Sequence, residues 1–310
     1  MTEDLAEFET AMRAVDSYLQ QAGLSSGQRE VLILAKDQFA AKERARLSVL
    51  EREGRFAFAP WLHFPMFGAL LGDEPLSRDL IVASALIEMG IDLLDSVMDD
   101  ELCEELKSIG PAIIQMNAYL LITVLPDSLL ESKQLAKKQQ ALLKVSAGQQ
   151  LDLQRRGSFC ETTYFDCIKQ KTGAWRALYF QISRADFHES WDGIITELGV
   201  VSQLYNDFHD IFNASWSVDL GNAIYTYPII CAYHKMSNDA RCDFELELQR
   251  TKNSLESQQV IRNKLKASGV LKSSYLFVSL LVLDLKRRAA RLAQTKEAAT
   301  LFDKIVQWHS

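Results

Sequence analysis

Four acidic residues are spaced so that one helical face would carry them all. They follow one another at intervals of four, three and four residues: Glu88, Asp92, Asp95 and Asp99. Residues three or four apart share one side of an α-helix, and the residues between these four are mostly apolar. Carboxylates at this spacing suit Mg2+, which binds through one or two carboxylates and substrate phosphate oxygens. A solvated surface face would show the same stripe, and the pattern alone leaves both interpretations open.

A second segment repeats the pattern of polar residues within an apolar helix. Its polar residues are Gln203, Asn206, Asp207 and Asp210: Gln203 precedes the middle two by three and four residues, and Asp210 follows them by four and three. This spacing again predicts a single helical face. Two such helices facing each other across a bundle would hold a diphosphate between two metal-binding walls.

Helices must position these side chains, because apolar residues recur at intervals of three and four almost throughout. Glycine (14) and proline (6) are sparse, and no alternating strand pattern is bounded by hairpin turns. The sequence Ser-Ser-Gly at residues 25–27 offers a cap for one helix. We therefore expect an all-α protein with a single domain over residues 1–310. The expected helices span residues 2–22, 27–52, 75–100, 110–124, 129–156, 160–187, 191–213, 225–235, 239–267 and 269–308, the last of them broken.

Composition argues against several classes of function. The net charge is −7 and no run of Lys or Arg suggests a nucleic-acid footprint, so nucleic-acid binding is not expected. The N-terminus is acidic, unlike a secretory signal, and no stretch of 18 uncharged apolar residues predicts a membrane span. The five cysteines lack C-x-x-C spacing, which favours reduced thiols and a cytoplasmic location.

Four motifs, in the same order and at matching separations, make the chain resemble the trans-prenyl diphosphate synthase superfamily. Residues 95–99 resemble its first aspartate-rich motif, D-D-x-x-D, and residues 203–210 resemble its second, Q-x-x-D-D-x-x-D. Residues 148–152 are similar to the G-Q-x-x-D element, and Lys171 and Thr172 are similar to the K-T element. The resemblance implies an isoprenoid-synthase-type helical bundle with a central apolar cavity. It also implies an allylic prenyl diphosphate substrate and a homodimer.

The same resemblance, which covers roughly residues 30–290, implies roles for single residues. The implied Mg2+ ligands are Asp95, Asp99, Asn206, Asp207 and Asp210. The implied catalytic residues are Asp95, Asp99, Lys171 and Asp207. The residues implied to bind or support the substrate are Gln149, Asp152, Lys171, Thr172, Gln203, Gly90 and Ile91. Gly90 and Ile91 are not bulky aromatics, so they permit a prenyl tail of 15 carbons or more, whereas His209 lies off the acidic face and is expected to be non-catalytic.

The sequence departs from the family pattern at the positions that decide the reaction. Ser96 replaces one aspartate of the first motif and Asn206 one of the second, although an asparagine carbonyl can still bind Mg2+. Elongating enzymes also hold isopentenyl diphosphate in a basic pocket. Here residues 54–60 contain a single arginine, residues 100–105 are acidic, and the lysine that precedes the late T-x-P element is missing. Ordinary chain elongation is therefore not expected.

This pattern resembles relatives that keep only the allylic site. The preferred hypothesis is Mg2+-dependent ionisation of a C10–C20 prenyl diphosphate and transfer of the prenyl group to a non-isopentenyl acceptor. The acceptor would be a peptide, as in ComQ-type prenyltransferases, or a small molecule, as in the moenomycin-pathway prenyltransferase. A class IB terpene synthase that cyclises its substrate is the first alternative. A non-catalytic partner subunit of a prenyl synthase is the second.

Overall fold

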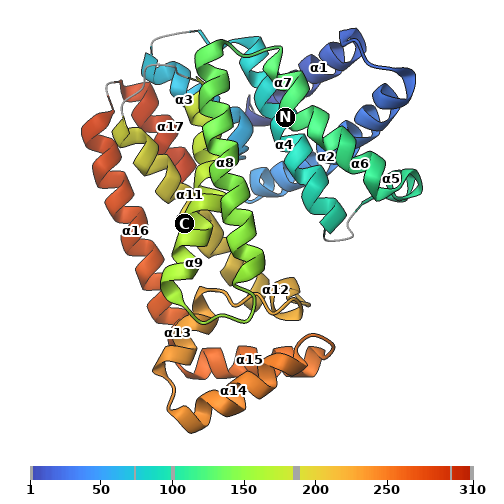
Figure 1. Cartoon of the computed structure of the whole chain (residues 1–310). Coiled ribbons are helices and arrows are strands. Elements are labelled where there is room, and N and C mark those ends of the chain that lie inside the picture. Colours follow the sequence, from blue (N-terminus) through green and yellow to red (C-terminus); the bar gives the residue numbers. More distant parts are fainter. Residues whose placement is uncertain (1–2, 73–74, 99–101, 184–188, 294, 308–310) are drawn as a thin grey trace. The chain divides into compact units, whose positions relative to one another are not determined.

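The computed structural model describes residues 3–72, 75–98, 102–183, 189–293 and 295–307, and these residues contain no strand. The all-α prediction is thus confirmed (Figure 1). The chain divides into two compact units, each described here by itself. The first unit comprises Met1–Lys138, Tyr179–Phe187 and Ala293–Trp308, and the second comprises Gln139–Leu178, His188–Leu292 and His309–Ser310. A single domain over residues 1–310 stays a prediction.

The first unit contains the N-terminal helices and the last helix of the chain. Its helices are α1 (Glu3–Gln21), α2 (Ser26–Arg52), α3 (Pro60–Gly72), α4 (Arg78–Met98), α5 (Glu104–Ile109), α6 (Pro111–Tyr119), the π-helical turn η1 (Leu120–Val124), α7 (Leu125–Asp127) and α17 (Lys296–Gln307). It also holds the start of α8 (Ser132–Gln154) and the end of α10 (Ala174–Ser183). A capping box starts α2, as the sequence predicts: the Ser25 hydroxyl accepts a hydrogen bond from the Gln28 amide, and the Gln28 side chain accepts one from the Ser25 amide.

Helix α4, which carries the first acidic stripe, is the central element of the first unit. It packs against α1, α2, α3, α6, η1 and α7. Most of its residues between Leu80 and Leu93 are buried. A Cβ atom at Gly90 would lie 2.6 Å from the Ile122 side chain and 3.0 Å from the Ala118 carbonyl oxygen. Gly90 therefore lets α4 approach α6 and η1 closely.

The second unit contains the remaining helices. They are α8 (Ser132–Gln154), α9 (Glu161–Ile168), the π-helical turn η2 (Lys169–Gly173), α10 (Ala174–Ser183), α11 (Glu189–Phe212), α12 (Val218–Gly221), α13 (Tyr227–Lys235), α14 (Asn238–Arg250), α15 (Leu255–Ala267) and α16 (Val270–Leu292). The chain passes from one unit to the other within α8 and α10. Figure 1 shows α14 and α15 as a helical hairpin.

Helix α11, which carries the second polar face, is the central element of the second unit. It packs against α9, η2, α12, α13 and α16. Two glycines allow η2 to lie close to its neighbours. A Cβ atom at Gly148 of α8 would meet the Lys171 backbone nitrogen at 2.3 Å, and one at Gly199 of α11 would meet the Gly173 Cα at 2.7 Å. These two glycines therefore bring η2 against both α8 and α11.

One buried histidine gives the first unit a testable pH dependence. His63 of α3 is only 1% exposed, and burial lowers its pKa to about 4. Because the unfolded chain binds this proton near pH 6.5 and the folded chain does not, stability is complete above pH 6.5 and falls as the pH drops towards 4. The full loss is about 3 kcal/mol.

We expect the His63→Gln protein, measured in the presence of a chelator, to lack this loss of stability at low pH. Urea unfolding of wild type and variant at several pH values between 7 and 4 measures it. The stability difference between the two proteins should shift steadily in favour of the variant as the pH falls. A constant difference over this range would show that His63 titrates normally.

No single helix in the described ranges is long and apolar enough to cross a membrane. Helices α15 and α16 meet this requirement together, by length and composition only, and they are bent by 69° relative to each other.

Candidate functional site

The three described carboxylates of the acidic stripe on α4 differ in their surroundings. Glu88 accepts a short hydrogen bond from the Tyr179 hydroxyl, and Asp92 pairs with Lys42 through a 2.7 Å contact. Asp95 is half-buried one turn after Asp92. Asp99 lies outside the described residues. Tyr179 and Lys42 thus engage the N-terminal half of the stripe.

Ser96 occupies a very different environment from Asp95. Its side chain is 1% exposed, and its hydroxyl oxygen has no hydrogen-bond partner in the described part of the chain. A carboxylate at this position would have to be buried on the packed side of α4. The serine that interrupts the first motif therefore suits its position in this helix.

Gly90 and Ile91 also lie on α4, one turn before Asp95. Gly90 is fully enclosed by the packing of α6 and η1, and Ile91 is half-buried. The role of these two residues in binding a prenyl tail stays a prediction.

In the second unit, Asp207 is the more buried of the two carboxylates of the second motif. It is 2% exposed and accepts hydrogen bonds from the Tyr164 hydroxyl (2.5 Å) and the Gln203 side-chain nitrogen (2.9 Å). Burial raises the pKa of Asp207 to about 6, and both hydrogen bonds act in the opposite direction. Both carboxylate oxygens of Asp207 are thus engaged by neighbours within the unit.

The K-T element is connected to this carboxylate. Thr172 in the π-helical turn η2 donates to the Gln203 side-chain oxygen at 2.8 Å, and Gln203 donates to Asp207. π-helical turns often occur at functional sites. The structure therefore brings together three of the predicted site residues in one hydrogen-bonded chain.

Asp152 links the G-Q-x-x-D element to two cations. Its carboxylate lies 3.0 Å from the Lys171 ammonium nitrogen and 2.7 Å from the Arg155 guanidinium. Burial acts to raise the pKa of Asp152, but Lys171 and Arg155 outweigh it and hold this pKa below its usual value. Gln149 is half-buried on the same helix, α8. Asp152 therefore stays ionised and holds both cations in place.

The other polar residues of the second motif differ in their surroundings. Asn206 is exposed. Asp210 accepts a short hydrogen bond from the Ser217 hydroxyl and a 3.1 Å bond from the Val218 amide. These two bonds tie α11 to the start of α12. His209 is exposed.

Sequence reasoning missed three residues of this site. Burial raises the pKa of Asp219 well above its usual value, and nearby Asp207 and Asp210 raise it further. Arg155 contacts Asp152 and also lies over the Tyr164 ring, 5.2 Å from its centroid. Arg155 lies three residues after Asp152, so the i, i+3 spacing was an available signal; Tyr164 and Asp219 carried none in the sequence.

The described carboxylates of the second unit fit a bound cation. Asp207 is buried and Asp219 is half-buried. Lost hydration raises the pKa of both carboxyls, and the charges of Asp207 and Asp210 raise that of Asp219 further. Hard carboxylate oxygens are the ligands that Mg2+ prefers. The donor set is therefore chemically suited to Mg2+, which would relieve the repulsion.

Arg155 allows a direct test of this network. We expect Arg155→Gln to lower the free energy of unfolding by about 2–3 kcal/mol. Removing one partner of a buried ion pair typically costs about 3–5 kcal/mol, and here Lys171 still neutralises Asp152. Urea unfolding measures the change. Arg156→Gln is the matched control, because Arg156 is the exposed neighbour and should change stability by about 0.5 kcal/mol or less; equal effects would contradict the network.

Comparison with known proteins gives one family match. The polyprenyl synthetase family matches residues 112–264, which include the G-Q-x-x-D, K-T and second aspartate-rich motifs. No curated protein matches the chain.

Solved structures match over nearly the whole chain. Geranylgeranyl pyrophosphate synthase from Corynebacterium glutamicum, complexed with isoprenyl diphosphate and magnesium, gives a TM-score of 0.76 at 14% identity over 100% of this chain and 99% of that one. Heptaprenyl diphosphate synthase from Staphylococcus aureus gives 0.75 at 14% identity, over 99% and 98%. Polyprenyl synthase from Caulobacter crescentus, complexed with calcium and isoprenyl diphosphate, gives 0.74 at 18% identity, over 97% and 94%.

At these identities the structural matches show the fold, and the family match adds the motif region. Residues 112–264 thus match the polyprenyl synthetase family, and the chain as a whole shares the fold of the matched prenyl diphosphate synthases. The family matched at residues 112–264 is one of polyprenyl synthetases, and the matched structures are those of synthases.

Proposed function

We propose that the protein ionises an allylic prenyl diphosphate of 10–20 carbons with Mg2+ and transfers the prenyl group to an acceptor other than isopentenyl diphosphate. The observation that carries this proposal is the network around Asp207 and Asp152. It joins three motif elements, two cations and the buried Asp207 carboxylate, whose pKa is raised, within one unit. Such an arrangement is suited to an anionic substrate bound with metal ions.

In this proposal Mg2+ would be held by Asp95 and Asp99 of the first motif and by Asn206, Asp207 and Asp210 of the second. When bound, Mg2+ would stabilise the charge that develops on the leaving diphosphate. Lys171 would contribute a further positive charge to that diphosphate, and Asp152 would hold the ammonium group in position. Tyr164 and Gln203 would fix the orientation of the Asp207 carboxylate. Thr172 would in turn orient Gln203.

The reaction breaks the bond between the allylic carbon and the diphosphate oxygen. The diphosphate leaves with the electron pair, and a nucleophilic atom of the acceptor forms the new bond to carbon and loses a proton. Apolar surroundings protect the cation from water. A peptide or a small molecule could supply the nucleophile.

The surroundings of residues 54–60 support an acceptor other than isopentenyl diphosphate. Ala57, Phe58 and Ala59 are buried where elongating enzymes place basic residues. Arg55 is exposed, and its guanidinium lies 3.4 Å from Glu53. Ile224 takes the place of the lysine before the T-x-P element. A second diphosphate would find few cations at these positions.

Product analysis tests transfer against cyclisation. Purified protein is incubated with Mg2+ and geranyl, farnesyl or geranylgeranyl diphosphate, with and without isopentenyl diphosphate, and organic extracts are analysed. Because no acceptor is supplied, water would take its place, so the proposal predicts slow diphosphate release with the prenyl alcohol as product, and neither elongated products nor cyclic hydrocarbons. Cyclic hydrocarbon formed in the absence of any acceptor would instead establish a terpene synthase, and elongated prenyl diphosphates would establish an ordinary synthase.

A homodimer is part of the proposal, and an exposed apolar stripe in the first unit supports it. The stripe runs along α6 and η1 through Ile113, Met116, Tyr119 and Val124, each about half exposed or more. Stripes of this kind commonly mark association surfaces. A cytoplasmic location likewise remains a prediction.

Met116→Asp is expected to convert the dimer to monomer, because it places a charge in the centre of the stripe (Met116 is 65% exposed). Size-exclusion chromatography with light scattering measures the mass. Leu246→Asp, at an exposed leucine of α14, is the matched control and should leave the mass unchanged. If both variants keep the mass of a dimer, the interface lies elsewhere.

A further inference from the structure

A mixed group of metal-ligating side chains lies at the start of the chain, away from every motif used above. Asp4 and Glu7 occupy the first turns of α1, and His63 lies on α3. One carboxylate oxygen from each acid and one ring nitrogen of His63 lie within 4.8 Å of one another. Acidic residues are also favourable at a helix N-terminus without a metal, so the carboxylates alone would not define a site.

The histidine supplies the second, independent observation. His63 is 1% exposed, and its Nε2 atom is buried without a hydrogen-bond partner in the described ranges. Its other ring nitrogen, Nδ1, lies 3.0 Å from the Ala59 carbonyl oxygen and 2.9 Å from the Ala59 amide nitrogen. We therefore take Nε2 as the nitrogen that faces the two acids. An unsatisfied buried nitrogen is rare in proteins and requires an explanation.

The Ala59 backbone offers a choice between two ring tautomers. When Nδ1 carries the proton, it donates to the Ala59 carbonyl oxygen and leaves a lone pair on Nε2. A metal-ligating histidine almost always donates its other ring N–H in this way. Burial keeps the ring neutral, since it lowers the pKa of His63 to about 4, and a neutral ring is the form that binds metals.

From this geometry we propose that Asp4, Glu7 and His63 form a binding site for a divalent transition metal, with Zn2+ as the reference ion. Imidazole nitrogen combined with carboxylates favours Zn2+, whereas Mg2+ prefers oxygen ligands alone. Ligand atoms at about 2.1 Å from Zn2+ in a tetrahedral site are roughly 3.4 Å apart. The half-exposed acids would therefore move inward by about an ångström when the ion binds.

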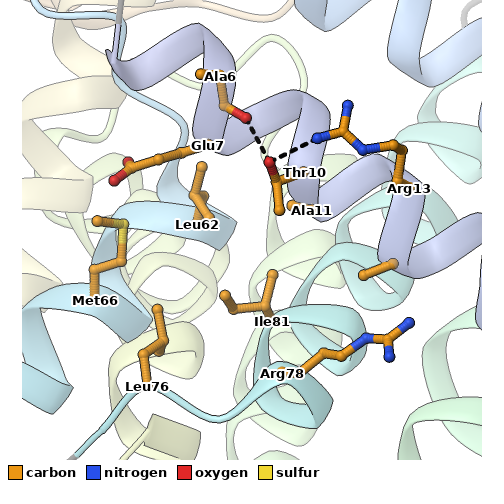
Figure 2. Close-up of a pocket in the computed structure, with 11 residues that line it drawn as sticks. Ala6, Glu7, Thr10, Ala11, Arg13, Leu62, Met66, Leu76, Arg78 and Ile81 are labelled. Atoms are coloured by element: carbon orange, nitrogen blue, oxygen red, sulfur yellow. Dashed lines mark hydrogen bonds between the residues drawn. The ribbon is translucent and has the colours of Figure 1, made fainter.

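A hollow beside Glu7 would give the ion an entry path and room for a water ligand. Its volume is about 750 Å3, and Glu7 lines it. Figure 2 shows the Glu7 carboxylate at one side of the hollow, with Leu62 and Met66 of α3 close to it. Arg13 and Arg78 lie at the other side, and Ile81 also lines the hollow. The site would therefore be open on one side, and the ion would tie α1 to α3.

Calorimetric titration of the full chain with Zn2+ tests the proposal. The protein is first treated with a chelator, and excess Mg2+ is present throughout to occupy sites built from oxygen ligands alone. We expect one Zn2+ per chain and a rise in Tm, because a ligand that binds only the folded state stabilises it. Glu7→Gln and His63→Gln should each weaken binding by about tenfold or more. Glu9→Gln is the matched control, since Glu9 lies on the same helix and is half-buried but pairs with Arg44.

Co2+ spectra separate this site from adventitious binding at the cysteines, two of which are exposed. Binding at the proposed site should give visible d–d bands without a thiolate charge-transfer band, and these bands should disappear in His63→Gln. The same variants should release diphosphate at the wild-type rate, so the outcome is independent of the proposed function. Absence of Zn2+ binding, or binding that is equal in wild type, Glu7→Gln and His63→Gln, would overturn the proposal.

Discussion

Replacing Asp95 with alanine is expected to lower the rate of Mg2+-dependent diphosphate release by a factor of about 10²–10³. Asp95 is half-buried on α4 and is the described member of the first aspartate-rich motif. Its loss would remove a metal ligand whose effect is greatest when charge builds on the departing diphosphate. Steady-state phosphate release in a coupled assay measures the rate, and circular dichroism confirms that the variant folds.

Asp92 provides a matched control one turn earlier on the same helix. Because Lys42 neutralises Asp92 at 2.7 Å, Asp92→Ala should change the rate by about threefold or less, as for a surface ion pair. Raising the Mg2+ concentration should partly restore Asp95→Ala, since weaker metal binding is the cause. If both variants lost the same fraction of the rate, Asp95 would have no special role as a metal ligand. The acidic stripe would then act as a whole, or the substitutions would act only by destabilising the fold.

Restoring the missing aspartate of the first motif is expected to damage the protein. Ser96→Asp should lower the free energy of unfolding by about 3–5 kcal/mol, the usual cost of an uncompensated buried charge. The reason is that Ser96 is 1% exposed and its hydroxyl has no partner among the described residues. Thermal unfolding should show a fall in Tm of roughly 10 °C.

Ser96→Ala distinguishes charge from a change of side-chain size. Removing a buried hydroxyl that has no partner should alter stability by about 1 kcal/mol or less. If Ser96→Asp were as stable as wild type and bound Mg2+ more tightly, residue 96 would face the metal site, and its assignment to the packed side of α4 would be wrong.

The helical architecture was largely predictable because the apolar periodicity is strong. The expected helix at residues 75–100 corresponds to α4 (Arg78–Met98), and the break in the last segment falls between α16 and α17. The predicted helix over residues 239–267 is in fact two helices, α14 and α15. Ser254 caps the second of them, and its side chain accepts a hydrogen bond from the Ser257 amide.

Helix α3 was not predicted, and the reason is physical. Most of its residues from Pro60 to Gly68 are buried and nearly all are apolar, so no polar face marks its period. Pro65 lies inside it, and proline inside a helical pattern argues for a break. Trp61 nevertheless anchors α3 by packing against Phe8 of α1 and Phe39 of α2. Its burial thus comes from tertiary contacts that no local pattern reports.

The candidate site was predictable as a set of positions but not as a network. Motif spacing indicated Asp152, Gln203 and Asp207 as site residues. The structure adds their partners: Asp152 pairs with Lys171, and Gln203 links Thr172 to Asp207. Tyr164 holds Asp207 from a different helix, 43 residues away. Such long-range contacts follow from the close approach of η2 at Gly148 and Gly199, which sequence periodicity does not report.

Diphosphate release by the purified protein is the measurement that tests the central claim most directly. Geranyl, farnesyl and geranylgeranyl diphosphate are supplied in turn, with Mg2+ or with chelator, and the released diphosphate is quantified. The account predicts release from at least one substrate only when Mg2+ is present, and almost none from the Asp95→Ala variant. No release from any of the three substrates, with Mg2+ and candidate peptide or small-molecule acceptors present, would contradict it and favour a non-catalytic partner subunit.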